Sequence, residues 1–164
     1  MHPNRILASL SPAAFEAVKP HLSLVDLKQG AVLAETRSLV ERVYFPHSGI
    51  ISLVVELKDG DMLETAMVGK DGALGGASAL DGKISLNKAI VQAPGVASIM
   101  KVERLRDLAL AHEDFRSRLI RHEQVLFASA QQSAACNASH LVEGLRGACA
   151  KHAGARAAAA LEHR

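Results

Sequence analysis

Residues 43–75, VYFPHSGIISLVVELKDGDMLETAMVGKDGALG, decide the fold of this chain. They contain two apolar runs with strand character, IISLVVEL and MLETAMV, and Asp59 and Gly60 stand between these runs. An Asp-Gly pair in this position predicts a tight β-hairpin, because both central residues of a type I′ turn need positive φ. Further turn residues occur at 46–49 and 69–72. The stretch therefore predicts short antiparallel strands joined by tight turns.

The same pattern extends beyond this stretch in both directions. From about Leu24 to Val102 the period is two, with candidate strands at 31–35, 42–49, 50–57, 62–69, 88–93 and 96–102. Many short strands at such regular spacing indicate an antiparallel sandwich or barrel. Ahead of them, Ser11 and Pro12 have the residue types of a helix N-cap and a first helical position, and Pro20 ends that short helix.

Residues 104–143 contain neither Gly nor Pro and are predicted to be helical. Five positions within this block repeat by threes and fours, as the contact line between two helices requires. They are Phe127, Ala130, Ala134, Asn137 and Leu141. The small alanines would let two helices approach closely, so we interpret this line as a seam between two copies of the chain. Packing of the helix on the chain's own core is the alternative.

Composition limits the class of protein. The chain has 164 residues, of which 49% are hydrophobic and 22% charged, as expected for one compact globular domain. A net charge of +2 and an aromatic fraction of 3% do not favour a nucleic-acid surface. We expect a cytoplasmic protein, because no apolar run is long enough for a membrane span and the N-terminus lacks a secretory signal. We expect no enzymatic activity, since no nucleophile–base pair or carboxylate dyad can be assembled.

A set of short strands, a glycine-rich turn and a long helix, in this order, resembles the sensor half of the CRP/FNR bacterial transcription regulators. The resemblance covers residues 6–143 and is carried by LASLSPAAFEAVKPHL, by the 43–75 stretch and by QQSAACNASHLVE. It implies a mainly β fold with flanking helices, in which an antiparallel β-roll (the jelly roll of cyclic-nucleotide-binding domains) precedes a long C-terminal dimerisation helix. The division that it implies is a sensor domain with an N-terminal helix at 1–112, the dimerisation helix at 113–143, and an Ala-rich tail without a DNA-binding domain at 144–164.

The resemblance also implies where a ligand would bind. In nucleotide-binding members, backbone N–H groups and an Arg neutralise the cyclic phosphate, and a Glu that follows a Gly binds the ribose. Here the Gly-Glu position reads Gly75-Gly76, and the place of the Arg falls at Leu86, Asn87 or Lys88. Of these, Lys88 could supply a positive charge, but it lacks the bidentate fork of Arg. The implied pocket is degenerate, for a cyclic nucleotide or another small anionic ligand. Its candidate residues are Gly75, Gly76, Ala77, Ser78, Lys88, Ala89 and Gln131. Lys88 is alternatively an exposed lysine at a strand edge, and Gln131 an exposed residue of the helix.

The function implied by the resemblance is that of a homodimeric sensor module in transcription regulation, responding to a small-molecule effector. Full-length relatives bind DNA, but we expect no sequence-specific DNA binding from this chain, because 144–164 contains no helix-turn-helix. One alternative is a stand-alone dimeric interaction module that binds no small ligand. A metal-dependent β-roll enzyme is another, although the roll lacks the HxH pattern.

Two cofactor-based sensors of the same family are less compatible with the sequence. An iron–sulfur sensor needs four cysteine thiolates, and this chain has only Cys136 and Cys149, which we expect to be free thiols. A haem sensor would use a side chain of the roll such as His21 or His47. Because His47 lies in the FPHSG turn, we interpret it as a turn residue.

Overall fold

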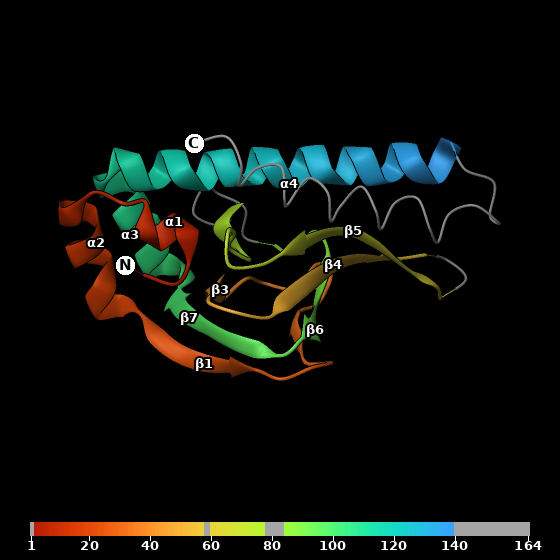
Figure 1. Ribbon diagram of the computed structural model, residues 1–164, viewed down its shortest axis with the longest axis horizontal. Coiled ribbons are helices and arrows are strands. Elements are labelled where there is room, and N and C mark those ends of the chain that lie inside the picture. The colour runs from red at the N-terminus through yellow and green to blue at the C-terminus, as the bar shows by residue number, and fades with distance from the viewer. Residues whose placement is uncertain (1, 58–59, 78–83, 140–164) are drawn as a thin grey trace.

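The computed structural model describes residues 2–57, 60–77 and 84–139, and Figure 1 shows how they are arranged. The described strands form two antiparallel sheets, one in the order β1-β7-β3 and the other in the order β2-β6-β4-β5. Their bounds are β1 Ser23–Leu27, β2 Val32–Ala34, β3 Arg42–Pro46, β4 Ile50–Glu56, β5 Met62–Val68, β6 Lys88–Ala93 and β7 Gly95–Lys101. Helices lie at one end of this roll and along one side of it (Figure 1). The prediction of a mainly β, antiparallel roll with flanking helices is confirmed.

The predicted hairpin joins β4 and β5. Glu56 pairs with Met62 at its closed end, and Ile51 pairs with Val68 at the other. Gly60 has a φ of +90°, and its N–H group donates to the Leu57 carbonyl over 3.0 Å. Gly60 therefore closes a turn that starts at Leu57, so the predicted type I′ turn with Asp59 and Gly60 at its centre is wrong; Asp59 itself lies outside the described residues. The inner face of this sheet buries Ile51 and Val68 in a core that also contains Val91 of β6.

Strand β1 has no counterpart among the predicted strands. It pairs with β7, with Ser23 opposite Ile99 and Leu27 opposite Gly95. Leu27 is the one residue of β1 that is fully buried, and Leu24 is 71% exposed. An edge strand with so little burial shows no clear apolar alternation in the sequence.

The N-terminal region contains two short helices, α1 (Arg5–Ala8) and α2 (Pro12–Val18). Ser11 caps α2 by accepting a hydrogen bond from the Ala14 N–H group, and Pro12 is the first residue of the helix, as predicted. Helix α2 ends at Val18, and a single 3₁₀ turn at Lys19–His21 contains Pro20. Helix α1 was not predicted; the fully buried Asn4 caps it.

The long helical block is broken into α3 (Val102–Ala111) and α4 (Glu113–Ser139), although it contains neither Gly nor Pro. His112 stands between them with extended backbone angles, φ −125° and ψ 103°. Its carbonyl accepts the Arg116 N–H group and so starts the second helix. The Ser11 N–H group donates to the Asp114 carboxylate over 3.0 Å, which lowers the pKa of Asp114 and ties the start of α4 to the cap of α2. The break therefore comes from tertiary contacts.

Helix α4 lies along the roll beside β5 (Figure 1). Phe115 and Leu119 anchor its first half, because both are fully buried in the core formed with α1, α2 and α3. Leu126, further along, packs against the core between the sheets. Residues 140–164, including Cys149 and the Ala-rich tail, lie outside the described part of the chain. Within the described part, no helix is both long enough and apolar enough to cross a membrane.

Candidate ligand-binding site

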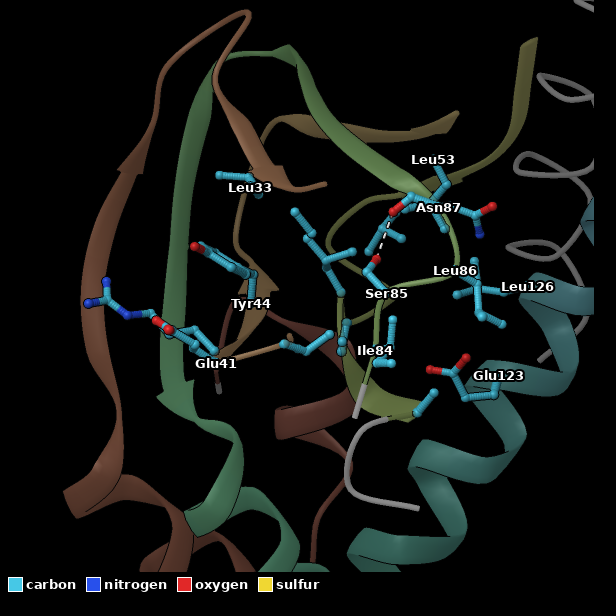
Figure 2. A pocket seen from close by; sticks show the side chains of 18 of the residues that line it. Leu33, Glu41, Tyr44, Leu53, Ile84, Ser85, Leu86, Asn87, Glu123 and Leu126 are labelled. Atoms are coloured by element: carbon cyan, nitrogen blue, oxygen red, sulfur yellow. Dashed lines mark hydrogen bonds between the residues drawn. The ribbon is translucent and has the colours of Figure 1, made fainter. Parts of the chain in front are cut away.

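A cavity of about 430 Å³ lies between the roll and α4. Its wall is formed by strands β2, β4 and β5, by β3 and the residues before it, by the turn at 73–77, by residues 84–87 and by α4 (Figure 2). Backbone hydrogen bonds hold the two irregular segments in place. Tyr44 and Leu74 exchange hydrogen bonds of 3.0 and 2.9 Å, and Ser85 donates its N–H to the Ser38 carbonyl over 2.9 Å. The cavity is therefore built by ordinary sheet-like pairing around its mouth.

The lining of the cavity is predominantly aliphatic. Leu33, Leu53, Val68, Leu74 and Leu126 contribute to it from separate parts of the fold. At the mouth, three more apolar side chains are largely exposed: Leu39 at 72%, Ile84 at 51% and Leu86 at 83%. Exposed apolar groups gathered around a concavity are typical of ligand sites.

Few polar groups line the cavity, and most of them are exposed or already bonded. Glu41 and Arg42 are exposed. The Ser85 hydroxyl donates to the Asn87 carbonyl over 2.7 Å. Tyr44 is half-buried, and the remaining ionisable group is Glu123 of α4.

Glu123 extends from α4 towards the segment that carries Ile84 (Figure 2). Its carboxylate accepts a hydrogen bond from the backbone N–H group of Ala77. Burial raises the pKa of Glu123, and the Ala77 N–H group, which favours the ionised form, partly opposes this shift. A Cβ atom placed on Gly76 would come within 2.9 Å of the Glu123 Oε1 atom. The turn at Gly76 thus admits the carboxylate because it carries no side chain.

His122, the preceding residue of α4, makes a second tie to the same turn. Its Nε2 atom lies 3.0 Å from the Ala73 nitrogen and 2.9 Å from the Ala73 oxygen. Burial lowers the pKa of His122, while its hydrogen bonding to Ala73 and the nearby Asp71 carboxylate oppose this shift. Gly72 is packed against the ring, since a Cβ there would come within 2.5 Å of the His122 Cε1 atom. The turn at 73–77 therefore contacts α4 at two adjacent residues of the helix, His122 and Glu123.

The structure brings only some of the predicted ligand residues to this cavity. Gly75 and Ala77 line it, and Gly76 contacts Glu123. Lys88 does not line it: its Nζ atom lies 3.4 Å from a Glu35 carboxylate oxygen. Nor is Lys88 at a sheet edge, because β6 lies between β2 and β4, so that alternative is wrong.

The other predicted ligand residues lie elsewhere. Ala89 is fully buried in the core rather than on the cavity wall. Gln131 is exposed and does not line the cavity either. Ser78 lies outside the described residues.

Three parts of the cavity wall were not predicted from the sequence: Glu123, Leu126 and residues 84–86. A signal for Glu123 was present, because it stands four residues after Leu119 and three before Leu126. A carboxylate on the buried stripe of a helix needs an explanation. The wall at 84–86 gave no comparable signal, since its apolar side chains are held by backbone pairing with residues 37–39.

The predicted seam positions on α4 are partly open to solvent. Phe127 is 65% exposed, Ala134 is exposed and Ala130 is half-buried. The Asn137 side chain and Leu141 lie outside what the structure describes. Val125, on the opposite side of the helix from Phe127, is 58% exposed.

His47, one of the two histidines that could serve as a haem ligand, has other partners. The His47 Nε2 atom lies 2.8 Å from the Ser98 hydroxyl, and the ring stacks edge-on against His2. Burial lowers the pKa of His47. Among the described residues, no group of three or more His, Cys, Asp or Glu side chains gathers as a metal site would require.

No protein-family model matches the sequence, and no curated protein matches it. The fold does match solved structures. The regulatory subunit of a cAMP-independent protein kinase A from Trypanosoma brucei has a TM-score of 0.62 at 16% identity, over 73% of this chain. The N-terminal domain of a transcriptional regulator from Streptomyces coelicolor A3(2) has a TM-score of 0.59 at 17% identity, over 87% of this chain. The catabolite activator protein of Thermus thermophilus has a TM-score of 0.59 at 16% identity, over 82% of this chain.

This chain spans 43% of the Trypanosoma subunit, 61% of the Thermus activator and 97% of the Streptomyces domain. At identities this low the similarity shows the fold alone, and fold by itself does not assign a function. The chain has the fold of the cyclic-nucleotide-binding domains found in CRP/FNR-type transcription regulators and in regulatory subunits of protein kinase A.

Proposed function

We propose that this chain is a dimeric, cytoplasmic sensor module of the CRP/FNR type that binds a small effector in the cavity beneath α4 and takes part in transcription regulation. The observation that carries the proposal is that α4 forms part of the cavity wall through Glu123 and Leu126. An effector in the cavity therefore contacts the same helix that carries the proposed dimer seam. The module acts by binding and has no catalytic role.

The coupling follows from differential contacts. A ligand shifts a conformational equilibrium only as far as it binds one state more tightly than the other. Here an occupant would contact Leu126 and Glu123 on one side and the 73–77 turn on the other. Because His122 and Glu123 already tie α4 to that turn, an occupant that strengthens or displaces these ties changes the free energy of the helix position. The seam then carries the change to the second copy.

The proposed seam has physical support on α4. Phe127 leaves 65% of its surface in water. Burying a phenylalanine side chain stabilises an assembly by roughly 1.5–3 kcal/mol, so a helix face with Phe127 and small alanines gains by pairing. Symmetric pairing about a two-fold axis would place two such faces against each other.

The fold leaves the identity of the effector open. The Trypanosoma protein with this fold is described as a cAMP-independent kinase subunit, so the fold does not by itself require cAMP. In the present chain, the N–H group of Ala77 is already bonded to Glu123, and Lys88 is paired with Glu35. We therefore propose that the site is degenerate as a cyclic-nucleotide site.

A ligand screen by thermal shift tests the proposal, followed by hydrogen exchange on the full chain. An effector of the proposed module raises the melting temperature and changes amide exchange both in the 73–77 turn and in α4. A stabilising compound that changes exchange in the turn and leaves α4 unchanged would contradict the coupling. Failure of every compound class to stabilise a folded dimer would favour the interaction module that binds no ligand.

A further inference from the structure

The cavity has an apolar interior and an apolar rim. Leu33, Leu53 and Leu126 face it from three different elements. At its mouth, Leu39, Ile84 and Leu86 are each more than half exposed. An occupant that covered these rim side chains would remove apolar surface from water on both sides of the contact.

The charge distribution around the cavity disfavours an anion. Glu123 lines the described wall with a half-buried carboxylate, which already holds the Ala77 N–H group. An anion beside it would meet a like charge and would have to compete for that N–H group. The nearby cation Lys88 is paired with Glu35 and does not line the cavity. Arg42 is exposed, so its attraction for a charge in the cavity is screened by solvent.

We propose that this cavity selects an uncharged, predominantly apolar small molecule, and that Glu123 is the specificity-determining residue that rejects anionic compounds of the same shape. The proposal rests on the proposed function, because it names the effector class of the same site. A neutral ligand leaves the bond between Glu123 and Ala77 intact, and a ligand N–H or O–H group can donate to the free lone pairs of the carboxylate.

Two fluorescent probes separate charge from shape. N-phenyl-1-naphthylamine is neutral at pH 8, and 8-anilinonaphthalene-1-sulfonate carries the same two ring systems with an added sulfonate. The full chain should bind the neutral probe saturably, with one site per chain. The sulfonate should bind about tenfold or more weakly, since an added negative charge beside the half-buried Glu123 carboxylate meets a like charge and has no cation as partner.

Three variants locate the site and its charge selectivity. Glu123→Gln keeps an oxygen that accepts from Ala77 and removes the charge, so the ratio of sulfonate affinity to neutral-probe affinity should rise towards one. Leu126→Trp fills the cavity from α4 and should abolish binding of the neutral probe. Val125→Trp is the matched control, because the neighbouring Val125 points into solvent, and it should bind like the unaltered chain. Circular dichroism checks that each variant is folded.

Three outcomes would overturn the proposal. One is equal or tighter binding of the sulfonate by the unaltered chain. The second is that Glu123→Gln binds the sulfonate, relative to the neutral probe, no more tightly than the unaltered chain does. The third is that Leu126→Trp still binds the neutral probe. If the chain is a folded dimer but does not bind the neutral probe, the proposed ligand class is wrong, whereas the proposal of a sensor module is not contradicted. The module itself fails on a different measurement, the mass of the assembly.

Discussion

The Oε1 atom of Glu123 lies so close to Gly76 that a Cβ atom on Gly76 would come within 2.9 Å of it. Helix α4 thus places a carboxylate against the turn whose N–H groups, in the nucleotide-binding proteins that this sequence resembles, face a cyclic phosphate. The carboxylate accepts the hydrogen bond of the Ala77 N–H group, which is then not free to bind a phosphate. This contact is the basis of the proposed selectivity for uncharged ligands.

Cyclic AMP is expected to bind this chain weakly or not at all. Two charge-assisted contacts of the nucleotide-binding relatives are absent here, one made by the Glu of the Gly-Glu pair and one made by the Arg. Such contacts contribute about 1.5–3 kcal/mol each. Their combined loss corresponds to about two to four orders of magnitude in affinity. Isothermal titration calorimetry measures this, and micromolar or tighter binding would contradict it.

Gly95→Ala is expected to destabilise the chain by about 3 kcal/mol, because overpacking here involves backbone that cannot yield easily. A Cβ on Gly95 would come within 2.3 Å of the Ser48 carbonyl oxygen and 2.6 Å of the Gly49 nitrogen. Gly69→Ala is the control: its Cβ meets only the Asp71 carboxylate, at 3.4 Å. Urea denaturation compares the two variants, and equal stabilities would show that the 46–49 turn and β7 approach less closely than described.

Asn4→Asp is expected to lower the unfolding free energy at neutral pH by about 3 kcal/mol, because two buried acceptors lose their donor. The Asn4 Nδ2 group donates to the Pro46 carbonyl over 3.0 Å and to the Gly72 carbonyl over 2.8 Å. A carboxylate facing these carbonyls would have a raised pKa, so the variant should regain stability as the pH falls and its carboxyl group protonates.

The control for Asn4→Asp is Ser9→Ala, which removes one partly buried hydrogen bond, from the Ser9 hydroxyl to the Ile6 carbonyl, and should cost about 1 kcal/mol without this pH dependence. Denaturant titrations of both variants at several pH values make the comparison. A loss of stability in Asn4→Asp that is the same at acid and neutral pH would contradict the arrangement around Asn4.

His122 is expected to make the stability of the chain fall at acid pH. Its pKa in the folded state is lowered from 6.5, mainly by burial. Its contribution to the unfolding free energy is therefore fully present above pH 6.5 and is lost as the pH falls through the folded-state pKa. His2 and His47 also have lowered pKa values, so the informative quantity is the difference between the unaltered chain and His122→Gln. Parallel curves of unfolding free energy against pH would rule out this role for His122.

Much of the roll could be predicted because its strands carry local signals. The Asp-Gly turn, the FPHSG turn and the alternating runs placed β2 to β7 close to their observed bounds. The first strand, β1, was not predicted, because Leu27 is the one buried residue in it and the strand therefore shows no apolar alternation. No local signal in residues 104–143 marks the helix break at His112, where Asp114 contacts Ser11, a residue distant in sequence. The start of a helix at 113 came from the resemblance and agrees with the first residue of α4.

The site was less predictable than the roll. Resemblance led to the turn at Gly75 to Ala77, which does line or border the cavity. It also led to Lys88, whose pairing with Glu35 could not be foreseen, since Glu35 lies on a different part of the chain. Glu123 was recognisable only by its place on the buried stripe of α4, and its partner Ala77 only from the packing of α4 against the turn.

Light scattering of the purified chain at tens of micromolar tests whether it is a dimer with α4 as the seam. A dimer has twice the chain mass of 17.4 kDa, and Phe127→Asp should reduce the measured mass to that of a single chain. Val125→Asp, on the opposite side of α4, should remain a dimer. A mass of 17.4 kDa for the unaltered chain, with no dimer at this concentration, would contradict the account.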